Sequence, residues 1–255
     1  MPGRVRDVQH ACAISPCLKT SSRGNDSDMP ILATIAAIVL LAIAFGPSWW
    51  IRHVLKAHGA ERSDLPGTGG EFARHLLDEA KLSNVKVEIT HEGDHYDPDA
   101  RAVRLLPNHH DGRSVAAVAV AAHEVSHAFQ HARGERAFAL RMDLVSKLVW
   151  IDRLATTILM LVPVAFILVK SPALAILQIG AAIALLGMHV VIHAVTLPVE
   201  FDASFGKALP VLEGRRYLSE KDMPAARRVL RAAAYTYVAA ALATLLNVMR
   251  WFRVR

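Results

Sequence analysis

Three residues in the middle of the chain have the types and the spacing of a metal site. His123, Glu124 and His127 form the pattern HExxH, within a segment, residues 115–131, that the sequence predicts to be helical. Because positions i and i+4 lie about one turn apart on a helix, both imidazoles project from the same face and can bind one metal ion. Zinc brings the pKa of a bound water to about 7, and Glu124 is placed to take its proton and pass it to a leaving amine. The pattern predicts an endopeptidase that uses a zinc-activated water, with Glu124 as the catalytic base.

The alternative explanation of this pattern is a pair of surface histidines on a helix. The residues directly before His123, VAAVAVAA, are small and apolar, which indicates a buried helix. Buried histidines beside a buried glutamate need hydrogen-bonding partners or a metal ion. The surrounding sequence therefore favours the metal site.

A catalytic zinc site needs a third protein ligand from elsewhere in the chain. The metzincin pattern has Gly and His where this chain has Gln130 and Arg133, so that class of zinc protease is excluded. A distant carboxylate fits better, and Glu200, just after a long apolar segment, is the leading candidate. His193, about two turns earlier on a helix, is the rival ligand and would move the site into that apolar segment.

Two tyrosines are candidates for roles beside the metal. A zinc peptidase needs a hydrogen-bond donor that stabilises the oxyanion developing on the substrate carbonyl. Tyr237 is the candidate for this catalytic role, and Tyr96 is the candidate for substrate binding. Each has the alternative of being a tyrosine that only packs or lies at a membrane interface.

The residues around HExxH predict the elements that must position it. Ser114 can cap the N-terminus of the helix that carries the pattern. Ahead of it, the sequence predicts an amphipathic helix at residues 71–80, a strand at 85–89 where apolar and charged residues alternate, and a second strand at 102–106. These elements form a compact, zincin-like α+β catalytic domain over residues 52–147.

The composition predicts that this domain is attached to membrane helices. Apolar residues make up 53% of the 255 residues, charged residues make up 20%, against about 25% in ordinary soluble domains, and the mean hydropathy is +0.29. About 20 apolar residues suffice to cross a bilayer. Long apolar blocks lie at residues 31–51, 154–169, 173–197 and 232–251. We expect a mainly α membrane protein with about four transmembrane helices and a small α+β zinc-metallopeptidase domain inserted after the first.

These expectations divide the chain into an N-terminal extension that is disordered or spurious, residues 1–28; a transmembrane helix, 29–51; the catalytic domain, 52–147; a transmembrane hairpin, 148–199; a cytoplasmic segment with the third zinc ligand, 200–231; and a C-terminal membrane helix with its tail, 232–255. Both cysteines, Cys12 and Cys17, lie in the extension. A cysteine zinc site or a disulfide framework in the rest of the chain is therefore excluded.

The positive charge of the chain indicates membrane topology rather than nucleic-acid binding. The net charge is +6 and the pI is near 9.6, but the basic residues flank apolar blocks, and no stretch interleaves them with exposed aromatic residues. By the positive-inside rule, we expect an integral protein of the bacterial inner membrane with its catalytic domain in the cytoplasm. The expected partners are a peptide or protein substrate and membrane lipid, and no nucleic acid. The arginines at 250, 253 and 255 conflict with four full spans, so the last helix is expected to span partly or to lie against the others.

Four stretches of the chain resemble one protein family. AVAAHEVSHAFQHA, DHYDP (94–98), GRSVAAVAVAAHE and TLPVEFDAS (196–204) look like the bacterial YugP-type neutral zinc metallopeptidases, a membrane family related in plan to the gluzincins of the HtpX and CAAX-prenyl protease types. The resemblance covers most of residues 31–251. It implies a zinc-dependent membrane peptidase with Glu200 as the third zinc ligand. It also implies that the strand at 102–106 offers its edge to an extended substrate.

One position departs from the pattern of the related gluzincins. They carry Asp where this chain has Ser204, so the carboxylate that would orient a zinc histidine is not supplied there. Asp202 lies two positions earlier, and on a helix it points to a different face.

Two other functions stay open on the sequence alone. An intramembrane zinc protease would place HExxH inside a full spanning helix and use a later Asp-Gly ligand, but only a short apolar run precedes His123 and no Asp-Gly follows it. A non-enzymatic membrane scaffold or chaperone with a structural zinc would not need a general base, so the intact Glu124 argues against it. Zinc-dependent cleavage of a peptide separates these functions.

Overall fold

The computed structural model describes residues 28–169, 172–214 and 217–239. The chain divides into two compact units, residues 1–40 and residues 41–255. In the first unit, the described residues form the N-terminal part of the long helix α1 (Asp28–Ala57). Apart from residue 28, the extension predicted at residues 1–28 lies outside the described residues.

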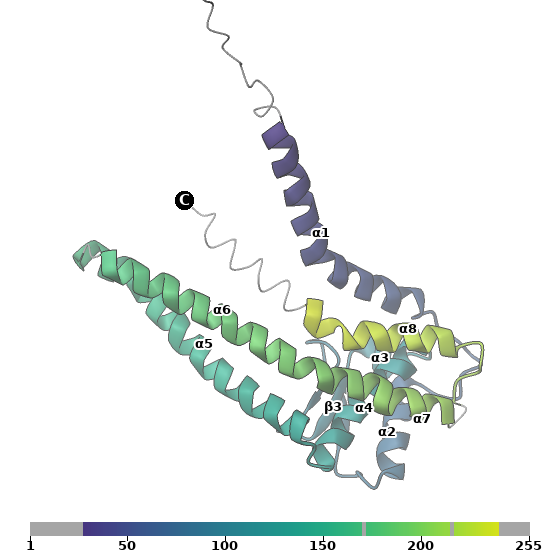
Figure 1. Ribbon diagram of the computed structural model, residues 1–255. Coiled ribbons are helices and arrows are strands. Elements are labelled where there is room, and N and C mark those ends of the chain that lie inside the picture. Colours follow the sequence, from purple (N-terminus) through teal and green to yellow (C-terminus); the bar gives the residue numbers. More distant parts are fainter. Residues whose placement is uncertain (1–27, 170–171, 215–216, 240–255) are drawn as a thin grey trace, which may run out of the picture. The chain divides into compact units, whose positions relative to one another are not determined.

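The second unit holds the remainder of α1 and all the other elements (Figure 1): α2 (Gly69–Glu79), β1 (Lys86–Ile89), β2 (His95–Asp97), β3 (Ala102–Leu105), α3 (Pro107–His110), α4 (Val115–Ala132), α5 (Arg136–Val169), α6 (Pro172–Phe201), the π-helix η1 (Asp202–Ala208), α7 (Leu209–Gly214) and α8 (Met223–Ala234). This order places the helix that carries HExxH after a small sheet and before a pair of long helices.

The sheet has the strand order β1-β3-β2. β1 runs parallel to β3, with Val87 opposite Val103, and β2 runs antiparallel to β3, with Tyr96 opposite Val103. The strands predicted at residues 85–89 and 102–106 are confirmed as β1 and β3. The predicted use of the second strand as a free edge is wrong, because β3 is paired on both sides and the edge strands are β1 and β2.

α4 is buried along almost its whole length. Every residue from Val115 to Ala128 is buried, and α2, α8 and η1 pack against this helix. Its N-terminal half is built from alanine and valine, so neighbouring backbones come close. At Gly69 of α2, for example, a Cβ atom would lie 2.8 Å from the carbonyl oxygen of Ala117 in α4. The predicted cap is confirmed, since Ser114 Oγ accepts a hydrogen bond from the backbone N–H of Ala117 at 3.0 Å.

The long apolar segments do not form the predicted membrane spans. Among the residues that the structure describes, no helix combines the length and the apolar character needed to cross a membrane. The prediction of about four transmembrane helices, assigned to residues 29–51, 148–199 and 232–251, is therefore wrong. The described chain is mostly helical with one small three-stranded sheet.

The physical reason is that parts of these segments pack against other elements of the protein. α5 and α6 do lie side by side (Figure 1), but the last turn of α6 buries Val199 and Glu200 against the rest of the second unit. The predicted last span begins in α8, a helix that carries Arg227, Arg228 and Arg231 and ends at Ala234. Its continuation over residues 240–255 lies outside the described residues.

Candidate metal centre

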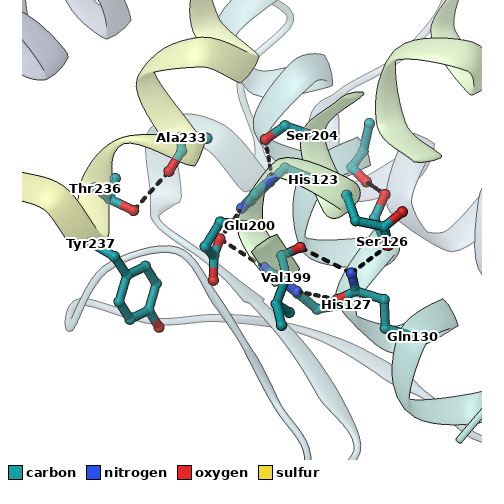
Figure 2. Close-up of polar contacts among 12 residues, drawn as sticks. His123, Ser126, His127, Gln130, Val199, Glu200, Ser204, Ala233, Thr236 and Tyr237 are labelled. Atoms are coloured by element: carbon teal, nitrogen blue, oxygen red, sulfur yellow. Dashed lines mark hydrogen bonds and ion pairs between the residues drawn. The ribbon is translucent and has the colours of Figure 1, made fainter. Parts of the chain in front are cut away.

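The two histidines of HExxH project from α4 toward one point. Their rings lie one helical turn apart and nearly perpendicular, edge to face, with centroids 4.8 Å from each other, and both residues are buried. Glu200 Oε2 lies 3.1 Å from His123 Nε2 and 3.3 Å from His127 Nε2 (Figure 2). The helix prediction therefore holds, and a carboxylate from α6 meets both imidazoles.

These three residues form a group that can hold a metal ion. One ligand atom from each of His123, His127 and Glu200 lies within 4.8 Å of the other two. Two imidazole nitrogens and a carboxylate oxygen, with room for a fourth ligand, are a donor set that catalytic zinc uses. Glu200 is 1% exposed. A carboxylate buried so deeply needs positive charge beside it, and the Arg141 guanidinium supplies this only at Oε1. Oε2 faces the two imidazole nitrogens, and this donor set fits a zinc ion.

A change in helix type positions the carboxylate. α6 ends at Phe201 and the chain continues as the π-helix η1, a rare helix type that is frequent at functional sites. Across this junction Glu200 and Ser204 both face α4, where they meet the same histidine.

Each histidine is held through its second ring nitrogen. Ser204 Oγ lies 2.9 Å from His123 Nδ1, and Gln130 Oε1 lies 2.9 Å from His127 Nδ1. A hydrogen bond from the Nδ1–H group fixes the tautomer and leaves the Nε2 lone pair for a metal. In this chain, then, the Ser204 hydroxyl takes the place of the aspartate of the related gluzincins, and the Gln130 amide holds the other histidine. Asp202 reaches His127 only through Gln130.

From the sequence, Gln130 only excludes the metzincin pattern, and no supporting role beside the metal is expected of it. It is 1% exposed, and its Nε2 donates to the carbonyl oxygen of Val199 at 3.0 Å and to Asp202 Oδ2 at 2.8 Å. One side chain thus connects His127 to the backbone just before Glu200 (Figure 2). Its position one turn after His127 on the same helix face is the sequence signal that could have identified it.

Glu124 lines a cavity of about 420 Å³ together with His123, His127 and Glu200. Burial raises the pKa of Glu124 to about 7, and His123 opposes this shift. Burial alone would also raise the pKa of Glu200, but the adjacent His127 and His123 hold it well below its usual value. The two carboxyl groups therefore differ in kind: Glu200 is held as a carboxylate, while Glu124 can exchange a proton near neutral pH.

Both candidate tyrosines line the same cavity. Tyr237, which follows α8, accepts a hydrogen bond from Arg141, and burial raises its pKa, so the phenol is protonated at neutral pH. The hydroxyl of Tyr96 lies 2.9 Å from His131 Nδ1. Arg141 has no recognisable pattern around it, and the sequence did not indicate its place in the cavity.

The rival ligand lies near this cavity but outside the metal group. The His193 ring centroid is 6.2 Å from that of Tyr237, and among the described residues His193 is not one of the clustered potential ligands. The loop before β2 also lines the cavity and is anchored by Asp94, whose carboxylate contacts His109 Nδ1 at 2.7 Å and the Leu106 N–H at 2.8 Å. This anchor explains the first residue of the DHYDP stretch.

Comparison with known proteins agrees with this geometry. The model of the family described as "Putative neutral zinc metallopeptidase" matches residues 33–255. Over 223 residues the chain is 35% identical to the "Putative membrane protease YugP" of Bacillus subtilis (strain 168), and the alignment covers 85% of this chain and 95% of that protein. No solved structure matches the chain. Zinc is the cofactor that the family and the buried His–His–Glu group both indicate. The resemblance predicted from the sequence is confirmed, and the chain belongs to the family of neutral zinc metallopeptidases.

Proposed function

We propose that this chain is a zinc-dependent endopeptidase in which His123, His127 and Glu200 hold the metal and Glu124 is the general base. The observation that carries the proposal is the meeting of three potential ligand atoms within 4.8 Å of one another, with Glu124 lining the same cavity. A structural zinc site has no use for a buried carboxyl that stays outside the ligand group. The family of neutral zinc metallopeptidases supports a peptide or protein substrate.

The residues of the centre suit the hydrolysis of a peptide bond. Zinc bound by these ligands would lower the pKa of a water molecule to about 7 and polarise the scissile carbonyl. Glu124 removes a proton from the water whose oxygen attacks the carbonyl carbon. It then delivers that proton to the amine nitrogen as the C–N bond breaks. Because the pKa of Glu124 is raised to about 7, the carboxyl group accepts and releases the proton near neutral pH.

Tyr237 is the proposed donor to the oxyanion. Its hydroxyl lies at the cavity that Glu124 and Glu200 line, and the proximity of these two carboxyl groups contributes to its raised pKa, after the larger effect of burial. A neutral phenol at that place can donate a hydrogen bond to the charge that develops in the transition state.

The substrate chain is proposed to lie along β2. This strand is the edge of the sheet nearest the centre, since Gly93, Asp94, His95 and Tyr96 line the cavity. An extended peptide can add to an exposed strand edge through backbone hydrogen bonds. The aromatic ring of Tyr96 then forms one side of the substrate site, while its hydroxyl stays hydrogen-bonded to His131.

The direct test is cleavage of casein or a fluorogenic peptide by the purified full-length chain. Hydrolysis that stops when zinc is chelated and returns when zinc is restored is the expected result. A protein that binds zinc stoichiometrically yet cleaves neither substrate would instead support a scaffold with a structural zinc.

Removal of the Gln130 side-chain amide should weaken both the fold and zinc binding. Gln130→Leu keeps the volume but leaves the Val199 carbonyl and His127 Nδ1 without their partner, and a buried unsatisfied polar group costs about 1–3 kcal/mol. Loss of the group that orients a metal ligand typically costs about 10–100-fold in metal affinity. Thermal unfolding and zinc titration measure the two effects. Ser146→Ala on the exposed face of α5 is the control, and equal behaviour of both variants would contradict this role.

We also propose that the chain associates with a membrane without relying on a described spanning helix. The B. subtilis relative is named a membrane protease, and large apolar side chains are exposed on α5 and α6, with Trp150 71% and Ile176 72% exposed. The Arg153 guanidinium lies 5.6 Å from the Trp150 ring centroid, a pairing that suits a membrane surface. Cell fractionation should recover the wild-type chain with the membranes. The double variant Trp150→Glu/Ile176→Glu should instead be recovered in the soluble fraction. Equal recovery of both in the soluble fraction would refute the association.

A further inference from the structure

Arg141 contacts two groups of the candidate metal centre at once. It lies near the start of α5, its side chain is 14% exposed, and it lines the cavity. Nη1 of its guanidinium lies 2.9 Å from Glu200 Oε1, and Nη2 donates a hydrogen bond to the Tyr237 hydroxyl. An element that supplies no metal ligand thereby joins the carboxylate of α6 to the tyrosine that follows α8.

The first contact divides the two oxygens of Glu200 between different partners. Oε2 faces the Nε2 atoms of His123 and His127, while Oε1 faces Arg141. Glu200 is 1% exposed, so its carboxylate depends on neighbouring side chains for its orientation. The contact is an ion pair without hydrogen-bond geometry, since Oε1 accepts no hydrogen bond from the described residues, and it acts through the permanent charge of the guanidinium. Its contact with Oε1 therefore keeps Oε2 directed at the metal position.

The second contact determines the direction of the phenol proton. A guanidinium has donors and no acceptor, so the Tyr237 oxygen must be the acceptor in this hydrogen bond. The proton of the Tyr237 hydroxyl is then free to be donated to another group at the cavity. The guanidinium carbon also lies 4.8 Å from the centroid of the Tyr237 ring, within the range of a cation–π contact, which fixes the ring itself.

We propose that Arg141 is a positioning residue that sets the metal-directed oxygen of Glu200 and the donor direction of Tyr237 together. The inference rests on the proposed peptidase function for its effect on turnover. Its effect on metal binding does not depend on turnover.

The zinc affinity of Arg141→Gln tests the contact with Glu200. Zinc titration of the full-length variant should give a dissociation constant raised by about 10–100-fold, the usual cost of losing a group that orients a ligand. Arg141→Lys keeps the charge but not the fork of donors, so it should fall between Arg141→Gln and the wild type. Arg136→Gln, the same substitution at an exposed arginine of α5, should bind zinc as the wild type does. Unchanged affinity in Arg141→Gln would overturn this half of the proposal. Should Arg141→Gln fail to fold, Arg141→Lys decides the question.

A double-mutant cycle at saturating zinc tests the contact with Tyr237. Arg141→Gln should retain a kcat deficit of about 10–100-fold even when its metal site is full, because the oxyanion donor is no longer directed. If Arg141 acts through Tyr237, the double variant with Tyr237→Phe should be no slower than the slower single variant. Additive losses would overturn the coupling. A wild-type protein that binds zinc but cleaves no peptide would defeat the proposed function, while the zinc titrations would still decide whether Arg141 positions Glu200.

Discussion

Glu124→Gln should abolish peptide hydrolysis while the protein keeps a full complement of zinc. Glutamine has nearly the shape of glutamate but cannot accept the proton of the attacking water, and loss of a general base costs about 10²–10⁴-fold in rate. Zinc should remain because Glu124 is not among the three clustered ligands. Metal analysis of the purified variant and the peptide assay, carried out on the same sample, measure both quantities.

The control for this variant is Glu92→Gln, the same change at an exposed glutamate in the loop before β2. It should leave rate and zinc content unchanged. Undiminished hydrolysis by Glu124→Gln would remove the proposed role of Glu124. Loss of zinc from that variant would instead assign Glu124 to the metal site and require a different base.

Glu200→Ala should lose zinc and activity together. The substitution removes one of three ligands and the sole carboxylate among them, so the loss of zinc affinity should exceed the about 10–100-fold cost of removing an orienting neighbour. It also leaves Arg141 without its buried partner, and breaking such a pair costs about 3–5 kcal/mol. Glu200→Gln keeps the shape of the side chain and separates metal loss from loss of the fold. Metal content, hydrolysis and circular dichroism are the measurements.

The matched control is His193→Ala, which removes the rival ligand from the same helix. It should keep stoichiometric zinc, because His193 lies outside the clustered ligands. Zinc retained by Glu200→Ala and lost from His193→Ala would be the opposite pattern. It would contradict the ligand assignment and place His193 among the metal ligands.

The apolar composition of the chain did not predict whether its helices cross a membrane or pack inside the protein. Apolar runs are needed both by helices that cross a bilayer and by helices that pack inside a protein, and hydropathy alone does not distinguish the two. In α6 the end of such a run carries Thr196, Val199 and Glu200 into the interior beside α4. The predicted spans were wrong for this reason, although the segments at residues 31–51, 154–169 and 173–197 were correctly expected to be helical.

The sequence by itself determined the features that depend on neighbours in the chain. The helix of HExxH, its Ser114 cap and the strands β1 and β3 follow from periodicity and local hydrogen bonding, which operate within a few residues. Tertiary structure decided which distant groups meet. Glu200 reaches His123 across 77 positions and Arg141 reaches Tyr237 across 96, and no local pattern encodes such pairs. The packing of α5, α6 and the residues after α8 around α4 brings them together, because the positions of these side chains are set by how whole helices fit and not by the residues beside them.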